Sequence, residues 1–239
     1  MRAVLRQTEQ THRMIERVKR IAILGSGNLG QLIAYYAVTT GQYQLSGFFD
    51  DFQPRDARVG LGRVMGSTKR DDVMRCYQAG QFDELIVGVG YRHFAFRKRL
   101  FEVLGSDIPF GKVVHSASYV DPSCRIGHGT VVLPGCTLDR NVIVEDNVVL
   151  NVGCVVAHDS AIGAHSFLAP GARIAGMVSV GRCCFLGVGT TVVSRTTLCD
   201  YTQTGGGAVV AKSTSKPGVY VGVPSRFLRA IDGPGGQVS

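Results

Sequence analysis

The chain has 239 residues, 45% of them hydrophobic, which is enough for one or two domains with buried cores. Its net charge is +8, but half of this excess lies in the first twenty residues, and the rest is only mildly basic, which argues against a nucleic-acid groove. No apolar run reaches the roughly 18 residues of a membrane span, and no signal-peptide core begins the chain. We therefore expect a soluble cytoplasmic protein without membrane insertion.

Residues 1–18 form a basic extension, in which Thr11 could cap a short helix. An α/β pattern follows, with a buried strand at 21–24, a glycine-rich turn at 25–30, a helix at 31–40 and a strand at 45–49. The free amides at the start of such a helix suit a phosphate, and an acid after the second strand is typical of ribose binding. The alternative is that the glycines serve only a tight turn.

Three more elements are expected, namely a helix at 71–79, a buried strand at 84–89 and a basic helix at 94–104. In a parallel sheet, Gly25, Asp50 and Gly90 would gather at the carboxyl ends of the strands, where ligands bind. We predict a Rossmann-like βαβ domain at 19–111. With about 90 residues before the next pattern begins, it fits a mononucleotide-sized ligand better than a dinucleotide.

From Val120 to Val210 an aliphatic side chain returns every six residues, and only Thr204 interrupts the series. A small or β-branched residue follows four positions after each aliphatic. Period six fits neither an amphipathic helix nor an alternating strand. It predicts a left-handed parallel β-helix at 112–212, with 18 residues per triangular coil and a tail at 213–239. Its flat faces predict self-association, with a homotrimer as the default.

The cysteines and histidines of this region do not have metal-ligand spacing, so we expect no metal. Cys124, Cys136, Cys154 and Cys184 fall in the small inward position, where a reduced thiol packs as a small hydrophobe. His128 and His158 differ by 30 residues, which is not a multiple of 18, and His158 and His165 lie at different points of the predicted triangle. A zinc site of the γ-type carbonic anhydrase kind is the alternative, which metal analysis would test.

His158 is the candidate catalytic base. It is followed by Asp159, and Gly176 lies one 18-residue coil further on. An imidazole can take a proton from an attacking amine or hydroxyl, an adjacent carboxylate can fix its tautomer, and a bare backbone N–H can stabilise an oxyanion. Spacing alone leaves open the alternative of a solvated corner histidine.

Several motifs together make the chain resemble a family of bacterial nucleotide-sugar acetyltransferases, which includes the sialic acid O-acetyltransferases and the bacillosamine-pathway N-acetyltransferase. The resemblance covers residues 19–228. The motifs are the glycine-rich turn, Phe48-Phe49-Asp50-Asp51, Gly88-Val89-Gly90, the stretch 151–159, Gly205-Gly206-Gly207-Ala208 and Val221-Gly222-Val223-Pro224-Ser225-Arg226.

The resemblance implies roles for individual residues. His158 matches the catalytic base, Asp159 an acidic partner that is often Glu, and Gly176 the amide that meets the thioester carbonyl. Val188 and Gly206 match positions along the pantetheine arm of acetyl-CoA. The positions matching those that hold the nucleotide-sugar are Gly25, Ser26, Gly27, Asn28, Asp50, Asp51, Gly90, Tyr91, Arg92 and Asn151.

Two positions depart from the family pattern. Asn28-Leu29 stands where relatives often have a histidine, which bears on the sugar contacts. Phe167 stands where they have a second histidine, which bears on a contact to acetyl-CoA.

The expected function is acetyl transfer from acetyl-CoA to the amino group of a UDP- or dTDP-linked amino-deoxy sugar, in a cleft between adjacent prisms. A sugar O-acetyltransferase is the nearest alternative, because the same base serves a hydroxyl. A non-catalytic β-helix binding protein is a further alternative from a different class.

Overall fold

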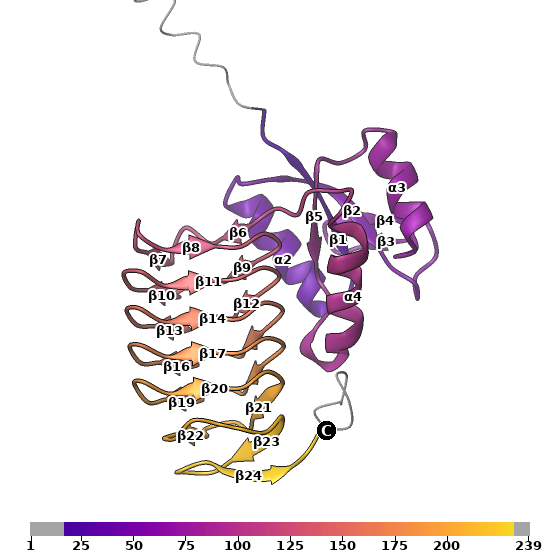
Figure 1. Cartoon of the computed structure of the whole chain (residues 1–239). Coiled ribbons are helices and arrows are strands. Elements are labelled where there is room, and N and C mark those ends of the chain that lie inside the picture. The colour runs from indigo at the N-terminus through magenta and orange to yellow at the C-terminus, as the bar shows by residue number, and fades with distance from the viewer. Residues whose placement is uncertain (1–16, 232–239) are drawn as a thin grey trace, which may run out of the picture.

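The computed structural model of the chain describes residues 17–231. The helix considered near Thr11 and the last residues of the tail lie outside this range. Figure 1 shows an α/β domain beside a stack of coils. None of the helices between residues 17 and 231 is both long enough and apolar enough to cross a membrane.

The first domain contains a five-stranded sheet with the order β3-β4-β2-β1-β5, parallel except for the β3–β4 hairpin. Its elements are β1 (Arg20–Leu24), α2 (Asn28–Thr39), β2 (Gln44–Phe49), β3 (Arg58–Val59), β4 (Gly62–Gly66), α3 (Arg70–Gln78), β5 (Glu84–Val87), the 3-10 turn η1 (Tyr91–His93) and α4 (Phe94–Leu104).

These elements follow the sequence pattern with three main differences. Helix α2 begins at Asn28 rather than at residue 31, inside the predicted glycine-rich turn. Strand β5 ends at Val87 rather than at residue 89. The β3–β4 hairpin was not predicted, because β3 has two residues and the hydrophobic pattern around it is short. The hairpin adds β4 to the edge of the parallel sheet beside β2.

Alternate side chains of the central strand face two different layers. Ile21 and Ile23 pack with α2 and with residues of the β-helix, whereas Ala22 and Leu24 pack with α3 and α4. The alternating side chains of the parallel strand are therefore buried on both sides of the sheet. On one side, the second domain takes part in burying them.

The second domain is a triangular β-helix with three parallel sheets. The docked face consists of β6 (Val113–Val114), β9 (Val131–Val132), β12 (Val149–Leu150), β15 (Phe167–Leu168), β18 (Phe185–Leu186) and β21 (Thr202–Thr204). The β7 face consists of β7 (Tyr119–Val120), β10 (Thr137–Leu138), β13 (Val155–Val156), β16 (Arg173–Ile174), β19 (Thr191–Val192) and β22 (Val209–Val210). The β8 face consists of β8 (Arg125–Ile126), β11 (Ile143–Val144), β14 (Ala161–Ile162), β17 (Ser179–Val180) and β20 (Thr197–Leu198).

Strand pairing confirms the predicted coil of 18 residues. Leu150 pairs with Leu168, and Val156 pairs with Ile174. The aliphatics of the series from Val132 onward form one continuous buried core, and Val114, Val120 and Ile126 pack against it in partly buried positions. The last coil continues into β23 (Gly218–Val221) and the antiparallel strand β24 (Arg226–Arg229).

The three edges of the prism differ in their turn residues. We call the edge between the docked face and the β7 face the glycine edge, because its turns place Gly135, Gly153, Gly171, Gly189 and Gly207 at positive φ. The edge between the β7 and β8 faces is called the histidine edge, and its positive-φ residues are Asn141, Asp159, Met177 and Arg195. The third edge has Gly129, Asn147, His165, Cys183 and Tyr201.

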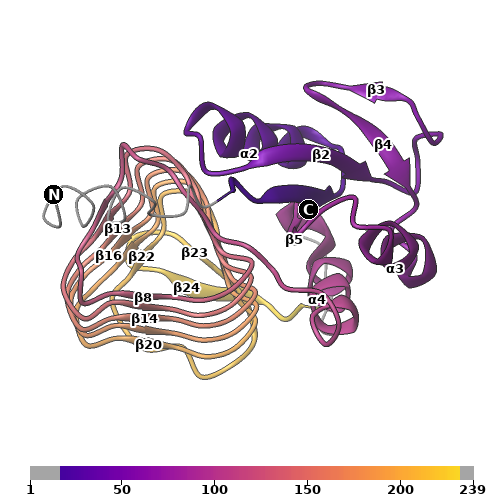
Figure 2. The ribbon, with the colours of Figure 1, turned by 90° about the horizontal axis from the view of Figure 1, so that it is seen from above.

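The α/β domain packs against the docked face, as the view along the prism axis shows (Figure 2). Val131, Val149, Phe167 and Phe185 point outward from this face and are buried. The ring of Tyr91 stacks on Phe185 with centroids 4.5 Å apart. The other two faces have no such cover within residues 17–231.

All seven cysteines are free. Cys136, Cys154 and Cys184 are buried in the small inward position, and their thiols contact backbone carbonyls of the next coil. Their packing is that of small core residues, as the sequence predicts.

Candidate active site

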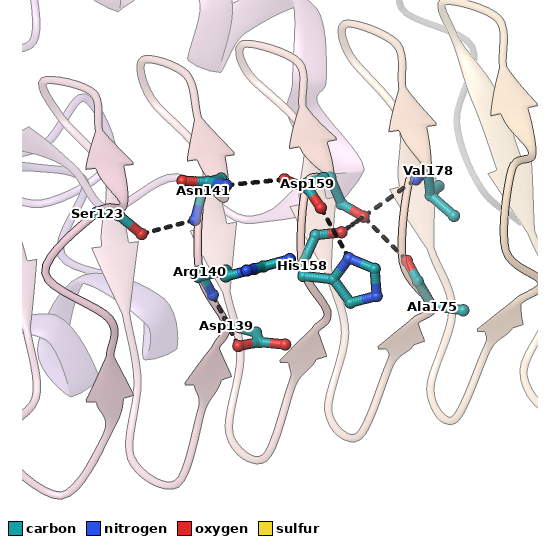
Figure 3. Close-up of polar contacts among 9 residues, drawn as sticks. Ser123, Asp139, Arg140, Asn141, His158, Asp159, Ala175 and Val178 are labelled. Carbon is teal, nitrogen blue, oxygen red and sulfur yellow. Dashed lines mark hydrogen bonds and ion pairs between the residues drawn. The ribbon is translucent and has the colours of Figure 1, made fainter.

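His158 and Asp159 share a turn of the histidine edge, between β13 and β14. Nδ1 of His158 lies 2.8 Å from Oδ2 of Asp159, and both side chains are partly exposed (Figure 3). Because an ionised carboxylate can only accept, the imidazole must donate from Nδ1. The neutral ring therefore presents a bare Nε2, which is the form a general base requires.

Gly176 lies directly against this ring, one coil further on. A Cβ at position 176 would lie 2.6 Å from Nε2 of His158, so only glycine fits the observed ring position. In the part of the chain that the structure describes, the Gly176 N–H donates to no acceptor, whereas the next amide, that of Met177, donates to the His158 carbonyl at 3.0 Å. A donor without a partner beside Nε2 is suited to an oxyanion.

The turn that bears the pair is tied to the turn that bears Gly176. The hydroxyl of Ser160 donates to the Ala175 carbonyl at 2.9 Å and accepts from the Val178 N–H at 3.0 Å (Figure 3). Ser160 belongs to the small inward positions of the sequence repeat. Its hydroxyl fixes the distance between the imidazole and Gly176.

A pocket of about 850 Å³ lies between the α/β domain and the docked face. It gathers most of the residues predicted to hold a nucleotide-sugar, together with Asn151 and Phe167 from the β-helix. The lining residues are Gly25, Gly27, Asn28, Leu29, Leu32, Asp50, Asp51, Phe52, Thr68, Gly88, Val89, Gly90, Tyr91, Arg92, His93, Phe96, Asn151 and Phe167.

Ser26 is not among the residues that line this pocket, and its predicted contact with the substrate stays a prediction. It is buried, and both its N–H and its hydroxyl donate to Oδ2 of Asp50, at 2.8 and 2.7 Å. The other oxygen of Asp50 accepts from the Phe52 N–H. Partial burial raises the pKa of Asp50, but the hydrogen bonds from Ser26 and Phe52 outweigh it and lower the pKa overall.

Asp51 is likewise occupied by the protein. Its two oxygens accept from the N–H and the hydroxyl of Thr68, at 2.8 and 2.6 Å. The two aspartates at the end of β2 therefore fix the loops around the pocket. Much of the hydrogen-bonding capacity of both carboxylates is therefore used within the protein.

The glycine-rich turn contains two glycines that its backbone requires, and it leads into the uncapped N-terminus of helix α2. Gly25 has a φ of 101°, and a Cβ on Gly30 would lie 2.0 Å from the Gly25 carbonyl oxygen, so both glycines serve the tight turn. Gly27 needs no such explanation, since its Cβ would meet nothing within 4 Å. Helix α2 starts after it with no side-chain cap and no acidic residue in its first turn. Its free amides therefore face the pocket.

Arg97, which the sequence showed only as one charge of a basic helix, is fully buried behind this pocket. Its guanidinium donates to the carbonyls of Val87 and Val89, both at 3.1 Å, and to that of Asn147 at 2.8 Å. Burial lowers the pKa of Arg97 to about 9, so it remains charged at neutral pH. It joins the pocket wall to the third edge of the β-helix.

The predicted pantetheine positions lie on the same edge as the pocket. Val188 and Gly206 occupy turns of the glycine edge, where Val188 is 60% exposed, and Asn151 lies on that edge too. His158 and Gly176 lie across the β7 face. Asn151 and His158 are seven positions apart, which at about 3.3 Å per residue sets an upper limit of about 23 Å.

Some functional candidates were missed by the sequence. Phe52, Thr68 and Phe96 line the pocket, and Phe52 is 92% exposed. The position of Phe52 after two loop aspartates could have indicated it, but nothing in the sequence around Thr68 indicates its contact with Asp51. Among residues 17–231, no three His, Cys, Asp or Glu side chains converge on a possible metal position.

No family model matches the chain. In sequence it is similar to curated UDP-3-O-acylglucosamine N-acyltransferases. It is 30% identical to that of Albidiferax ferrireducens over 129 residues, which are 51% of this chain and 39% of the relative. It is 33% identical to that of Bordetella avium over 102 residues, which are 41% of this chain and 28% of the relative. The chain thus spans less than half the length of these relatives.

In structure it is similar to bacterial sugar acetyltransferases over most of its length. The acetyltransferase domain of PglB from Neisseria gonorrhoeae, also solved with acetyl coenzyme A, has a TM-score of 0.79 and 24% identity, covering 88% of this chain and 100% of that chain. PerB from Caulobacter crescentus, solved with CoA and GDP-perosamine, has a TM-score of 0.80 and 25% identity, covering 89% and 98%. These similarities confirm the resemblance seen in the sequence: the chain is similar to bacterial left-handed β-helix acyltransferases of nucleotide sugars.

Proposed function

We propose that the chain is an acetyl-CoA-dependent N-acetyltransferase that acts on the amino group of a nucleotide-linked amino-deoxy sugar. The observation that carries the proposal is the pair of His158 and Asp159 beneath Gly176. It combines a base in the required tautomer with an amide that has no acceptor among residues 17–231. The cytoplasmic location of the protein stays a prediction from the sequence.

The reaction is a direct transfer. The amine nitrogen attacks the thioester carbonyl carbon, and the carbonyl oxygen of the tetrahedral intermediate accepts a hydrogen bond from the Gly176 N–H. Nε2 of His158 takes the proton that the nitrogen loses, while Asp159 stabilises the resulting imidazolium. The C–S bond then breaks, and the proton passes to the leaving thiolate of CoA. No protein nucleophile is needed.

The pocket supports a nucleotide-sugar as the acceptor substrate. The open N-terminus of α2 suits a diphosphate, and Arg92 and His93 add positive or neutral donors at the mouth. The exposed ring of Phe52 suits a nucleobase. Asn151 stands at the β-helix side of the pocket. Its side-chain oxygen accepts from the Val152 N–H, which leaves the amide hydrogens for a sugar.

The similar proteins favour an amine, rather than a hydroxyl, as the group that accepts the acetyl. The curated sequence relatives are N-acyltransferases of a UDP-sugar, and the Caulobacter protein is called a perosamine N-acetyltransferase in its variant structures. In two of those variants one histidine is replaced, by asparagine or by alanine. Because the Caulobacter ligand carries GDP, the carrier here is to be sought among GDP as well as UDP and dTDP.

The arrangement of edges supports a site shared between two copies of the chain. The pocket reaches the glycine edge at Asn151 and the pantetheine positions lie on that edge, whereas the base lies on the histidine edge, across the β7 face. Reacting atoms must approach to about 3–3.5 Å. A second copy whose histidine edge meets the glycine edge of the first would complete the site, and a closed ring of three copies satisfies every edge.

The test is a screen of UDP-, dTDP- and GDP-linked amino sugars with acetyl-CoA, followed by thiol release and product mass. A stable gain of one acetyl group that resists mild base and hydroxylamine identifies an amide. A base-labile acetyl group would instead identify the O-acetyltransferase. We expect His158→Ala to lower turnover at least ~10²-fold with the melting temperature unchanged. Binding of both ligands in thermal-shift assays without any transfer would favour the non-catalytic alternative.

A further inference from the structure

We propose that Asn141 is a positioning residue for this acetyl transfer. It holds the carboxylate of Asp159 and thereby keeps His158 in the tautomer that leaves Nε2 free. The inference rests on the proposed function. It concerns a residue that neither the sequence repeat nor the resemblance to the acetyltransferases singles out.

The contact links two neighbouring turns of the histidine edge. Nδ2 of Asn141 donates to Oδ1 of Asp159 at 2.9 Å, while Oδ2 of the same carboxylate accepts from His158 (Figure 3). Each oxygen of Asp159 thus has one partner, on opposite sides. The hydrogen bond from Asn141, and after it that from His158, lowers the pKa of Asp159 below its ordinary value.

Such a second contact matters because Asp159 is exposed. The terminal torsion of an aspartate is broad, so one hydrogen bond on an exposed side chain does not fix the plane of the carboxylate. Holding the second oxygen removes this freedom. The amide of Asn141 does not ionise in the working range of pH, so its hold does not depend on pH.

Asn141 is itself anchored from the preceding coil. Its backbone N–H donates to Oγ of Ser123 at 2.7 Å, and the Ser123 hydroxyl donates to Oδ1 of Asp121 at 2.6 Å (Figure 3 shows the first of these). Its φ is 60°, a conformation that asparagine tolerates better than most residues. The chain of contacts from Ser123 through Asn141 to Asp159 therefore runs along one edge over three coils.

The corresponding positions beyond Asp159 do not offer the same contact. One and two coils further, the positive-φ residues of this edge are Met177 and Arg195. Only the coil before the histidine carries an amide at this position. Asn141 is therefore matched to Asp159 specifically, and it is not a general feature of the turns.

The test uses Asn141→Gly, since glycine accepts a φ of 60° and removes only the amide. Loss of one hydrogen bond to a charged group predicts a fall in kcat of roughly tenfold, with KM for both substrates within about twofold. Arg195→Gly, the same change at a positive-φ position of this edge, should keep kcat. Equal losses in both variants would overturn the proposal, because the turn and not the amide would then be responsible.

A double-mutant cycle separates positioning from general support. In an Asp159→Gly background, Asn141→Gly should have no further effect on kcat, because the carboxylate that it holds is gone. Independent, multiplying losses would show that Asn141 acts by another route and would end the proposal.

A readout without activity keeps this inference separate from the proposed function. In the ¹⁵N spectrum of the histidines, His158 of the wild type should show the Nδ1–H tautomer, with His158→Ala identifying its signals. In Asn141→Gly the signals should move towards a mixture of tautomers. Unchanged signals would contradict the role of Asn141 even if no acetyl acceptor is ever found, whereas failure of every acetyl transfer would contradict only the proposed function.

Discussion

A Cβ at position 176 would lie 2.6 Å from Nε2 of His158, so the imidazole can hold its observed position only while residue 176 is a glycine. Gly176→Ala should therefore displace the imidazole and lower turnover by about 10²-fold, because a misplacement of about 1 Å can cost that much. Ser194→Ala, at the corresponding turn one coil further, should leave turnover and melting temperature unchanged. Full activity of Gly176→Ala would show that the ring works from another position.

A site shared between two copies, as proposed above, predicts complementation between inactive variants. Gly90→Trp fills the pocket, at a backbone φ of −74° and with open space for its Cβ, while His158→Ala removes the base. Mixed rings formed by co-expression should regain about one quarter of wild-type activity, since a quarter of the sites combine an intact base with an intact neighbouring pocket. No recovery in mixed rings, with each variant folded, would place the whole site within one chain.

The buried Arg97 predicts a selective effect on the nucleotide-sugar. Arg97→Lys keeps the charge, but a single ammonium cannot reproduce the planar contacts to Val87, Val89 and Asn147. We expect KM for the nucleotide-sugar to rise about threefold to tenfold and the melting temperature to fall, with KM for acetyl-CoA unchanged. Lys98→Met, in the same helix, where Lys98 makes a long ion pair to Glu102, is the control and should change neither KM.

Replacing Thr204 by an aliphatic residue should complete the sequence repeat but destabilise the fold. Its hydroxyl accepts from the Gly187 N–H at 2.9 Å and contacts the Thr190 hydroxyl at 2.7 Å, all buried. Thr204→Val restores the aliphatic series but leaves that N–H without its partner, which costs about 1–3 kcal/mol in the free energy of unfolding. Denaturant titration should detect the loss, and Thr191→Val on the β7 face should show none. A more stable Thr204→Val would refute this account.

His165 predicts a loss of stability in mild acid. Burial, and next the positive charges of Arg182 and Arg97, lower its pKa to about 4 from the ordinary 6.5. Between these values the unfolded chain binds a proton that the folded chain does not, so stability falls as pH decreases from about 6.5 to about 4, by about 2–3 kcal/mol from this group.

The control for this effect is His165→Asn, because asparagine tolerates the φ of 64° at that position. The difference in unfolding free energy between pH 7 and pH 4.5 should be smaller in His165→Asn than in the wild type. Equal differences would show that other groups cause the acid sensitivity.

The prism and its register could be predicted because the repeat is local and strictly periodic. Once Val156 and Ile174 share the core, the position of Gly176 over His158 follows from counting 18 residues. The same counting places Asn141 next to Asp159, but an asparagine in a turn has a common structural explanation, so the sequence does not single it out. The βαβ pattern was also predictable, apart from the start of α2, the end of β5 and the β3–β4 hairpin.

What the sequence could not decide is what each polar group does with its hydrogen bonds. Ser26 and Asp50 both belong to motifs that suggest ligand contacts, yet the hydroxyl of Ser26 donates its hydrogen bond to Asp50. Arg97 looks like its exposed neighbours in the basic helix, yet it lies buried between two domains. Such choices depend on which surfaces meet, and no periodicity encodes them.

The sequence by itself therefore determined the architecture and the coil register, because period-six burial and an 18-residue coil leave one arrangement, whereas His158 became the candidate base only through the resemblance to the acetyltransferases. Only the tertiary structure decided that the base and the nucleotide pocket lie on different edges of one prism. The reason is physical: the docking of the α/β domain on one face depends on long-range apolar packing around Val149, Phe167 and Phe185, and that packing sets the pocket a full face away from His158.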